Sequence, residues 1–234
     1  LILGFILVNG IEGKLIISVL EERMKYGIFK NFEDLMKRAS IPLEQLVLII
    51  RIGALRDFPE SRKELLWKAH LHHNRSKIKL PVPQLFEQEQ KTFHLPQLTE
   101  QTLELAFEQM ELLGFPLCNP FDLLKNEIPV HTMGNELHQF LGLRIHTYGY
   151  LVALKQSKTS KGDMMFFGTF IDRNGDIIDT VHFPEVARRF PFYGKGIYQL
   201  IGIISEEFGY YTIEIGEMVK QAFMEDIRFS EEEI

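Results

Sequence analysis

The sequence has one cysteine, one tryptophan and no long uninterrupted apolar run. The single cysteine, Cys118, cannot form a disulfide within the chain, so a reducing compartment such as the cytoplasm fits best. No apolar run reaches the roughly 18 residues that a membrane-spanning helix needs. The apolar opening of the chain is broken by polar residues and glycines and has no charged start, which excludes a signal peptide. We therefore expect a cytoplasmic protein with no membrane partner.

The chain also lacks an excess of basic residues. Its 234 residues include 26 Lys and Arg against 32 Asp and Glu, which gives a formal net charge of −6. This balance argues against a protein coated in nucleic acid, but it leaves room for a local basic patch. Apolar residues make up 45% of the chain, so a sizeable core in one or two domains is expected.

Residues 1–58 have the spacing of short helices separated by tight glycine turns. Apolar residues recur at helical spacing over 14–25, and Gly27 follows as a stop signal. Asn31 is a good N-cap for a second helix, and Pro42 sets the first turn of a third. The sequence therefore predicts a helical first region.

The turn from Val8 to Gly13 resembles the hairpin of a helix-hairpin-helix motif, in which exposed backbone N–H groups hold a DNA phosphate. Its candidate DNA contacts are Asn9, Gly10, Gly13 and Lys14. Glu12 stands where the usual hairpin has its second glycine, and a carboxylate there would repel phosphate. A turn that only packs helices therefore stays open as the alternative.

Residues 59–134 are predicted to be a helical and extended linker, and residues 223–234 an acidic tail. Three prolines between residues 79 and 98 exclude a regular helix there. Leu85 and Phe86 in this stretch could enter a groove on a partner protein. The alternative is that both side chains dock onto the chain's own core.

From residue 142 the pattern becomes that of β-strands, within a predicted domain at 135–222. Three strand-like segments are expected at 141–156, 164–171 and 176–183. A short helical segment follows at 184–196, and two more strand-like segments at 198–207 and 210–218. Three strands, a helix and two strands is the order of an OB-fold, a small barrel that commonly binds oligonucleotides. The expected fold class is therefore α+β, with a helix-hairpin-helix region followed by a five-stranded OB barrel.

The run Asp172-Arg173-Asn174-Gly175-Asp176 has the composition of a calcium loop, an acid cluster or a hairpin turn. Counted from Asp172, glycine comes at the fourth position and Phe183 at the twelfth, which does not fit an EF-hand. Asn174-Gly175 instead predicts a type I′ hairpin, with positive φ at both residues. No metal site or cofactor is expected.

The predicted loop between the first two strands carries Lys155, Lys158 and Lys161 with no acid between them. Three ammonium groups at the mouth of a barrel suit contact with a phosphate backbone, although a solvated loop is the plain alternative. Tyr148, Phe166, Phe167 and Phe170 could offer faces for base stacking, and alternation places about half of them in the core. Phe167 and Arg173 complete the candidate DNA contacts.

Several segments resemble the bacterial replicative DNA polymerase III alpha subunit. Residues 159–190 are similar to its OB-fold segment, and "EQMELLGFPLCNPFDLL" (108–124) is similar to its E-x-x-x-L-G-F-x-L-S-G-H-P-L-D junction, with Cys118-Asn119 in place of S-G-H. Residues 27–39 and 48–58 are similar to runs in its helix-hairpin-helix region. The OB pattern is matched at Thr159, Lys161, Gly162, Met165, Phe167, Thr169, Asp172, Gly175, Phe183 and Pro184.

The resemblance implies a cytoplasmic DNA replication protein, of which this chain looks like the C-terminal portion. In that family, a DNA-directed DNA polymerase (nucleotidyltransferase), the catalytic aspartates lie upstream, so this region is expected to grip template and primer DNA without catalysis or a cofactor. The family's sliding-clamp peptide, Q-x-x-L-F, would correspond to Leu85 and Phe86, with Val82 at the Gln position. Other replisome subunits are further implied partners. Glu12 and the negative charge favour an alternative, an OB-fold interaction module that has lost nucleic-acid binding.

Overall fold

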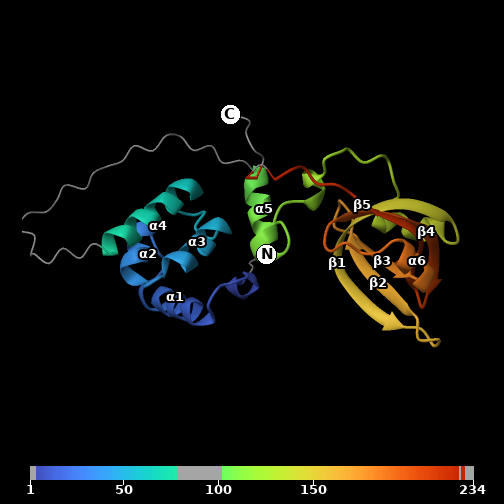
Figure 1. Cartoon of the computed structure of the whole chain (residues 1–234), viewed down its shortest axis with the longest axis horizontal. Coiled ribbons are helices and arrows are strands. Elements are labelled where there is room, and N and C mark those ends of the chain that lie inside the picture. Colours follow the sequence, from blue (N-terminus) through green and yellow to red (C-terminus); the bar gives the residue numbers. More distant parts are fainter. Residues whose placement is uncertain (1–3, 78–101, 227, 230–234) are drawn as a thin grey trace, which may run out of the picture. The chain divides into compact units, whose positions relative to one another are not determined.

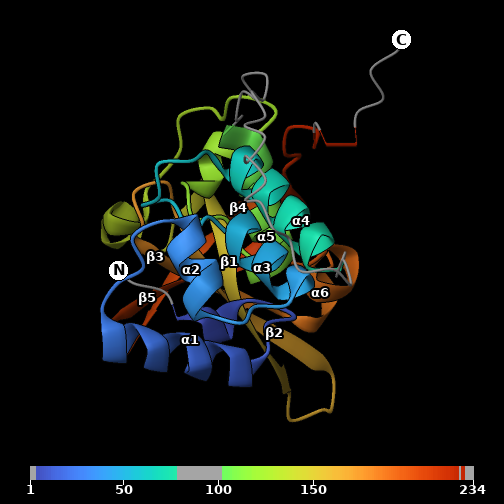
Figure 2. The same cartoon turned by 90° about the vertical axis from the view of Figure 1, so that its left-hand side faces the viewer.

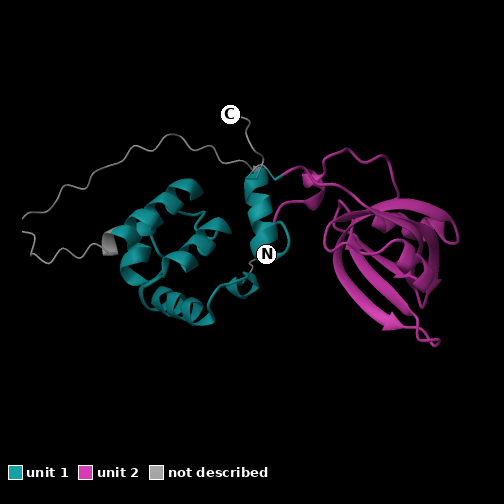
Figure 3. Ribbon diagram, viewed as in Figure 1, with its two compact units in different colours: residues 1–116, 226–229 teal, residues 117–225, 230–234 magenta. Residues whose placement is uncertain are grey.

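The computed structural model describes residues 4–77, 102–226 and 228–229. Two compact units are visible in Figure 1 and are coloured separately in Figure 3, and Figure 2 shows helices α1 to α4 from another side. The helical unit comprises the described residues up to Pro116 and those between Asp226 and Phe229; the barrel unit comprises Leu117–Glu225. The described helices include none with the length and apolar character required to cross a bilayer.

The helical unit is built from short helices around one apolar core. Its elements are η1 (Phe5–Leu7), α1 (Gly13–Tyr26), α2 (Phe32–Arg38), α3 (Leu43–Arg51), α4 (Arg62–Lys77) and α5 (Thr102–Leu113). As predicted, Asn31 caps α2: its Oδ1 accepts a hydrogen bond from the backbone N–H of Asp34 at 2.9 Å. Pro42 is the N-cap of α3. The buried core includes Phe32, Leu35, Leu46, Ile49, Ile50 and Leu65.

Arg38, at the end of α2, holds the end of α1 in place. Its guanidinium donates hydrogen bonds of 2.8 Å to the carbonyl oxygens of both Glu22 and Gly27. It also pairs with Asp34 at 3.2 Å and lies 4.3 Å from the centroid of the Phe29 ring. The carbonyl of Gly27, just beyond the last turn of α1, has no donor within the helix, and Arg38 supplies one while also bonding to the last turn at Glu22. Arg38 is thus committed to structure and is not available for a phosphate.

Replacing Arg38 by methionine should destabilise the helical unit by about 2 kcal/mol, because the alkyl stem remains while the hydrogen bonds to carbonyl groups are lost. Urea denaturation followed by the fluorescence of Trp67, the single tryptophan and a residue of α4, would measure this. Lys37→Met, at the neighbouring exposed position, is the matched control and should change stability by no more than about 0.5 kcal/mol. Equal effects of the two substitutions would contradict this role.

A cluster of ion pairs joins α3, α4 and α5 to the returning segment 226–229. Glu108 is buried and pairs with Arg51 at 3.1 Å and with Arg62. Arg228 lies 3.2 Å from Glu111 and pairs with Asp226 at 2.6 Å. Opposite charges surround each buried group, which offsets the cost of removing it from water. Residues 226–229, which the sequence suggested as part of an acidic tail, thus belong to the helical unit.

The barrel unit confirms the OB-fold prediction. Its strands close in the order β1-β2-β3-β5-β4, with a parallel pair between β3 and β5 and antiparallel pairs elsewhere. The short helix α6 lies between β3 and β4, as the pattern of the sequence predicted. The elements are η2 (Pro120–Leu123), η3 (Gly134–Phe140), β1 (Arg144–Lys158), β2 (Met164–Ile171), β3 (Ile177–His182), α6 (Pro184–Arg189), β4 (Ile197–Glu207) and β5 (Tyr210–Lys220).

The barrel core is centred on Phe170, which is completely buried. Two glycines make room for its side chain: a Cβ on Gly149 would lie 2.6 Å from the Phe170 Cβ, and one on Gly168 would lie 2.7 Å from its ring. A ring of this size fits a small barrel only where neighbouring positions have no side chain. The residues packed with it include Tyr198, Leu200, Ile204 and Ile213.

The turn at Asp172–Asp176 joins β2 to β3 as a hairpin, but not in the predicted type I′ form. Only Gly175 has a positive φ (90°), and Asn174 does not. The backbone N–H of Gly175 donates to Asp172 O at 3.1 Å, and that of Asp172 donates to Asp176 O at 2.9 Å. A β-turn followed by one left-handed glycine is the common three-residue hairpin connection.

The carboxylate of Asp172 stabilises this turn by accepting hydrogen bonds from its backbone. It is buried, and its Oδ1 accepts hydrogen bonds from the backbone N–H groups of Asn174 (2.8 Å) and Asp176 (2.9 Å). Its Oδ2 accepts one from Gly134 N, also at 2.9 Å. These donors hold the residues after Asp172 in a turn and tie the turn to the start of η3. The acid that suggested a metal loop is therefore a structural one.

Candidate nucleic-acid interface

The β1–β2 hairpin projects beyond the barrel (Figure 1), and the predicted lysines lie on it. The sequence had suggested that all three lysines lie in the loop. In the structure Lys155 and Lys158 are on strand β1, and of the three only Lys161 is in the loop. Pairing continues to Lys158 and Met164 because the connection is short: Thr159 N donates to Asp163 O at 2.8 Å. The strand thus fixes the backbone at two of the three lysines.

All three lysines are exposed. Within the described part of the chain, no carboxylate pairs with Lys155, Lys158 or Lys161. Unpaired ammonium groups on a projecting hairpin keep their full attraction for an anion, because no internal ion pair has to be broken first.

Among the four candidate aromatic residues, Phe167 alone faces outward with an exposed side chain, at 39% exposure. Phe170 is buried in the core, and Phe166 packs against Phe192 at a centroid distance of 5.9 Å. Tyr148 is covered by a separate apolar cluster that includes Phe121 and Leu124. Alternation along β2 therefore leaves Phe167 as the ring available for stacking on that strand.

Strand register places the exposed lysine and the exposed ring side by side. Lys155 of β1 is the direct partner of Phe167 of β2, which in turn is the partner of Val181 of β3. Cross-strand partners have neighbouring side chains on the same face of a sheet. A cation beside an aromatic ring on the outer face of β1–β3 can contact a phosphate and a base of one nucleotide strand.

Two arginines that the sequence reasoning did not single out lie at the same end of the barrel. Arg188 and Arg189 are exposed in the last turn of α6, a helix that packs against β2. The consecutive basic pair in "RRF" was the available signal, but only the fold brings α6 next to the strand that carries Phe167.

Arg173 is not brought together with the lysines. It lies in the β2–β3 turn, at the opposite end of β2 from Lys161, and its guanidinium is 3.3 Å from the carboxylate of Asp122. Its carbonyl oxygen accepts a hydrogen bond from Asn119 Nδ2 at 3.0 Å. The geometry favours a role for Arg173 in fixing residues 119–122 to the turn.

In the hairpin of the helical unit, the candidate DNA contacts Asn9, Gly10, Gly13 and Lys14 are exposed. Gly10 has a φ of +83°, which suits glycine. Helix α1 begins at Gly13, and its N-cap, Glu12, makes no side-chain capping bond. The first backbone N–H groups of α1 are therefore not capped by a side chain, and the exposed Glu12 carboxylate stands beside them.

Gln45 of α3 fixes the shape of this hairpin, and sequence reasoning missed it. Its Nε2 donates to Gly10 O and its Oε1 accepts from Glu12 N, both at 3.0 Å. The side chain is buried, although glutamine is usually exposed. One buried amide thus satisfies a donor and an acceptor of the turn at once.

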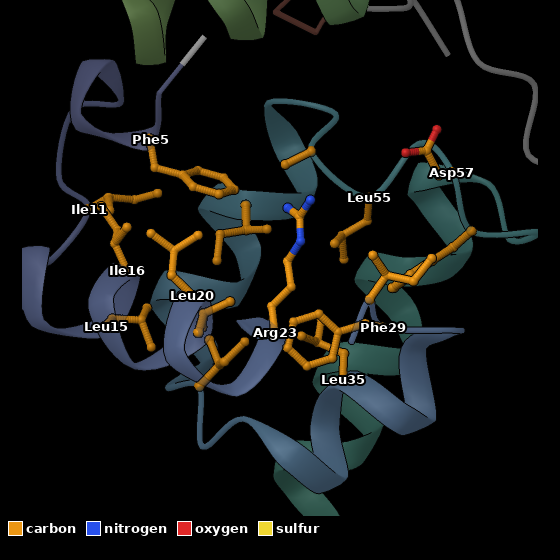
Figure 4. A pocket seen from close by; sticks show the side chains of 16 residues that line it. Phe5, Ile11, Leu15, Ile16, Leu20, Arg23, Phe29, Leu35, Leu55 and Asp57 are labelled. Atoms are coloured by element: carbon orange, nitrogen blue, oxygen red, sulfur yellow. The ribbon is translucent and has the colours of Figure 1, made fainter. Parts of the chain in front are cut away.

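The helical unit also contains a pocket of about 240 Å³ beside the hairpin (Figure 4). Figure 4 shows Arg23 extending into it and Asp57 at its edge. Most of the lining is apolar, so the pocket does not suit a hydrated phosphate. Its apolar lining includes Phe5, Ile11, Leu15, Leu20, Phe29 and Leu55.

The proposed clamp contacts, Leu85 and Phe86, lie outside the described residues. Among the described residues, no group of three or more His, Cys, Asp or Glu side chains is arranged to hold a metal ion.

Comparison with known families supports the helix-hairpin-helix prediction for the first region of the chain. Residues 1–65 match the model of a helix-hairpin-helix motif. The chain is similar to the second OB-fold domain of replication protein A from Methanococcus maripaludis, with 15% identity over 34% of this chain and 85% of that one and a TM-score of 0.27. A putative nucleic acid-binding lipoprotein from Klebsiella pneumoniae subsp. pneumoniae MGH 78578 has 10% identity over 38% of this chain and 78% of that one, with a TM-score of 0.30. No curated protein matches the chain.

Proposed function

We propose that this chain is a non-catalytic DNA-binding region of a protein of the DNA polymerase III alpha type. The barrel would hold single-stranded template, and the helix-hairpin-helix region would contact duplex phosphates. The observation that carries the proposal is the projecting β1–β2 hairpin. Its three lysines have no carboxylate partner among the described residues, and Lys155 lies beside the exposed ring of Phe167.

The match of residues 1–65 to a helix-hairpin-helix model supports the duplex contact, since helix N-termini with free N–H groups bind phosphate. The polymerase assignment rests on the sequence motifs given above. This assignment implies a cytoplasmic role in replication, without catalysis or a cofactor in this region. It also implies a sliding-clamp contact at Leu85 and Phe86 and contacts with other replisome subunits.

Single-stranded DNA binding tests the proposal. Fluorescence anisotropy of labelled oligothymidylate with the full chain should show binding that weakens with salt. Changing Lys155, Lys158 and Lys161 together to glutamine should reduce the slope of log affinity against log salt by about 2, because each phosphate contact on a single strand contributes about 0.7. Phe167→Ala should weaken binding roughly tenfold through lost stacking.

Lys125→Gln is the control, since Lys125 is already paired with Glu225 at 3.0 Å. It should leave the affinity within about twofold of the unmodified chain. Absence of binding at low salt would reject the proposal in favour of an interaction module without nucleic-acid binding. Glu12 and the net charge of −6 favour that second candidate.

A further inference from the structure

The end of the β4–β5 hairpin exposes an unusual amount of apolar surface. The turn residue Phe208 is 98% exposed and the neighbouring Tyr210 is 76% exposed. Leu143 lies further along the same hairpin, beside Ile204, whose backbone N–H donates to the Leu143 carbonyl oxygen at 3.1 Å. We call the following exposed residues the hairpin patch: Leu141, Leu143, Ile203, Phe208 and Tyr210. Large apolar side chains gathered on a surface indicate a binding site more often than chance exposure.

Phe208 is also in an unfavourable backbone conformation. Its φ is +54°, and Gly209 follows with a φ of +84°. Positive φ at both turn residues suits Asn-Gly or Gly-Gly, whereas a bulky side chain is strained there. The phenylalanine gains nothing from burial to compensate for this strain. Its presence is explained if the ring contacts a partner.

Two acidic side chains, Glu207 and Glu214, lie on the same face as the patch. The one neighbouring cation that the structure describes, Arg144 on β1, is already 3.8 Å from Glu217. Glu206 and Glu207 are the direct partners of Tyr211 and Tyr210, and Glu214 is the partner of Ile203. In the described residues, neither Glu207 nor Glu214 has an ion pair or a side-chain hydrogen bond, while Glu206 accepts one from Gly209 N at 2.8 Å. These carboxylates would repel a phosphate backbone and attract a cation.

We propose that the hairpin patch docks a basic peptide segment of a partner protein, in which apolar anchors alternate with Lys or Arg. The anchors would pack on Phe208, Tyr210 and Leu143. The cationic side chains would meet Glu207 and Glu214, and arginine could also stack on the exposed rings. This surface is separate from the lysine hairpin and does not depend on the proposed DNA binding.

A random peptide library displayed on phage and selected on the full chain tests this proposal. The recovered peptides should be rich in Lys or Arg with apolar residues between them. In fluorescence polarisation, the best synthetic peptide should bind the Phe208→Asn variant at least about tenfold more weakly. The melting temperature of that variant should stay unchanged or rise, because asparagine suits the turn, so a loss of binding would not reflect unfolding.

Glu207→Gln and Glu214→Gln should each weaken the peptide severalfold, whereas the triple lysine variant of β1–β2 should bind it unchanged. Selection of no peptide that depends on Phe208 would overturn the proposal. It would equally be overturned if Phe208→Asn left peptide binding intact but weakened labelled oligothymidylate, which would make the patch a nucleic-acid contact.

Discussion

Asp172→Ala should lower the free energy of unfolding of the barrel unit by about 4 kcal/mol, since a buried carboxylate is removed from three backbone donors. The N–H groups of Asn174, Asp176 and Gly134 would lose their acceptor. A hydrogen bond to a charged group contributes more than a neutral one, and an unsatisfied buried donor adds its own penalty. The turn between β2 and β3 would lose the group that shapes it.

Urea denaturation followed by the near-ultraviolet circular dichroism of tyrosine would measure this effect. Tyrosine reports mainly on the barrel unit, because six of the seven lie there: Tyr148, Tyr150, Tyr193, Tyr198, Tyr210 and Tyr211. Asn174→Ala is the matched control in the same turn, because Asn174 is exposed and contributes only its backbone N–H. It should change stability by no more than about 0.5 kcal/mol. A cost below about 1 kcal/mol for Asp172→Ala would show that the carboxylate does not hold the turn.

Acid should destabilise the barrel unit before its carboxylates titrate, because of His182. This side chain is completely buried, and burial lowers its pKa to about 4. Its Nε2 lies 2.9 Å from Thr180 Oγ1, and that hydroxyl donates its one proton to Gly168 O at 2.9 Å. The neutral ring therefore donates from Nε2, and Nδ1 is buried without a partner. Protonation would place an N–H with no acceptor, and a charge, inside the barrel.

The unfolded chain binds this proton with a pKa near 6.5, above the folded value, so unfolding takes up a proton between these two pH values. The contribution of neutral His182 to the free energy of unfolding is therefore fully present above about pH 7. It is smaller by about 2 kcal/mol at pH 5 and by about 3 kcal/mol at pH 4. His146 should add to the fall, since burial, with a smaller effect from His131, lowers its pKa too. Tyrosine-monitored urea denaturation at a series of pH values measures the slope.

His182→Gln keeps a side chain able to donate to Thr180 but has no titrating group. Whatever its stability at neutral pH, it should lose about 3 kcal/mol less than the unmodified chain between pH 7 and pH 4. His138→Gln, at an exposed position of the same unit, is the control and should keep the full decline. An undiminished decline in His182→Gln would refute this assignment.

The positions of most helices and strands could be predicted from local patterns. Strand β2 spans Met164–Ile171 as predicted, because β-branched and aromatic residues between turn signals favour a strand whatever surrounds them. Asn31 was identified as a cap for the same reason: its hydrogen bond joins residues three positions apart. The type I′ prediction at Asn174-Gly175 was wrong because the Asp172 carboxylate, held by Gly134 from a distant segment, favours another turn.

The candidate site was predictable only in part. The lysines at 155, 158 and 161 were visible as an acid-free cluster, but their place on a projecting strand depends on how far β1 and β2 stay paired. Gln45 and Arg38 gave no usable local signal, since each bonds to residues far from it in the sequence. The α6 arginines were visible as a basic pair, but only the fold brings their helix next to β2. Likewise, only burial distinguishes Phe167 from Phe170.

The sequence by itself determined the helical first region, the order of strands and the OB architecture, because periodicity, turn residues and caps act over a few neighbouring positions. Tertiary structure alone decided which side chains are free to bind. It placed Phe167 outside beside Lys155, buried Asp172 as an acceptor, used Arg38 to satisfy a carbonyl, and left Phe208 exposed at a strained turn. The physical reason is that exposure and pairing of a side chain depend on segments that are distant in the chain and meet only when the barrel closes and the helices pack.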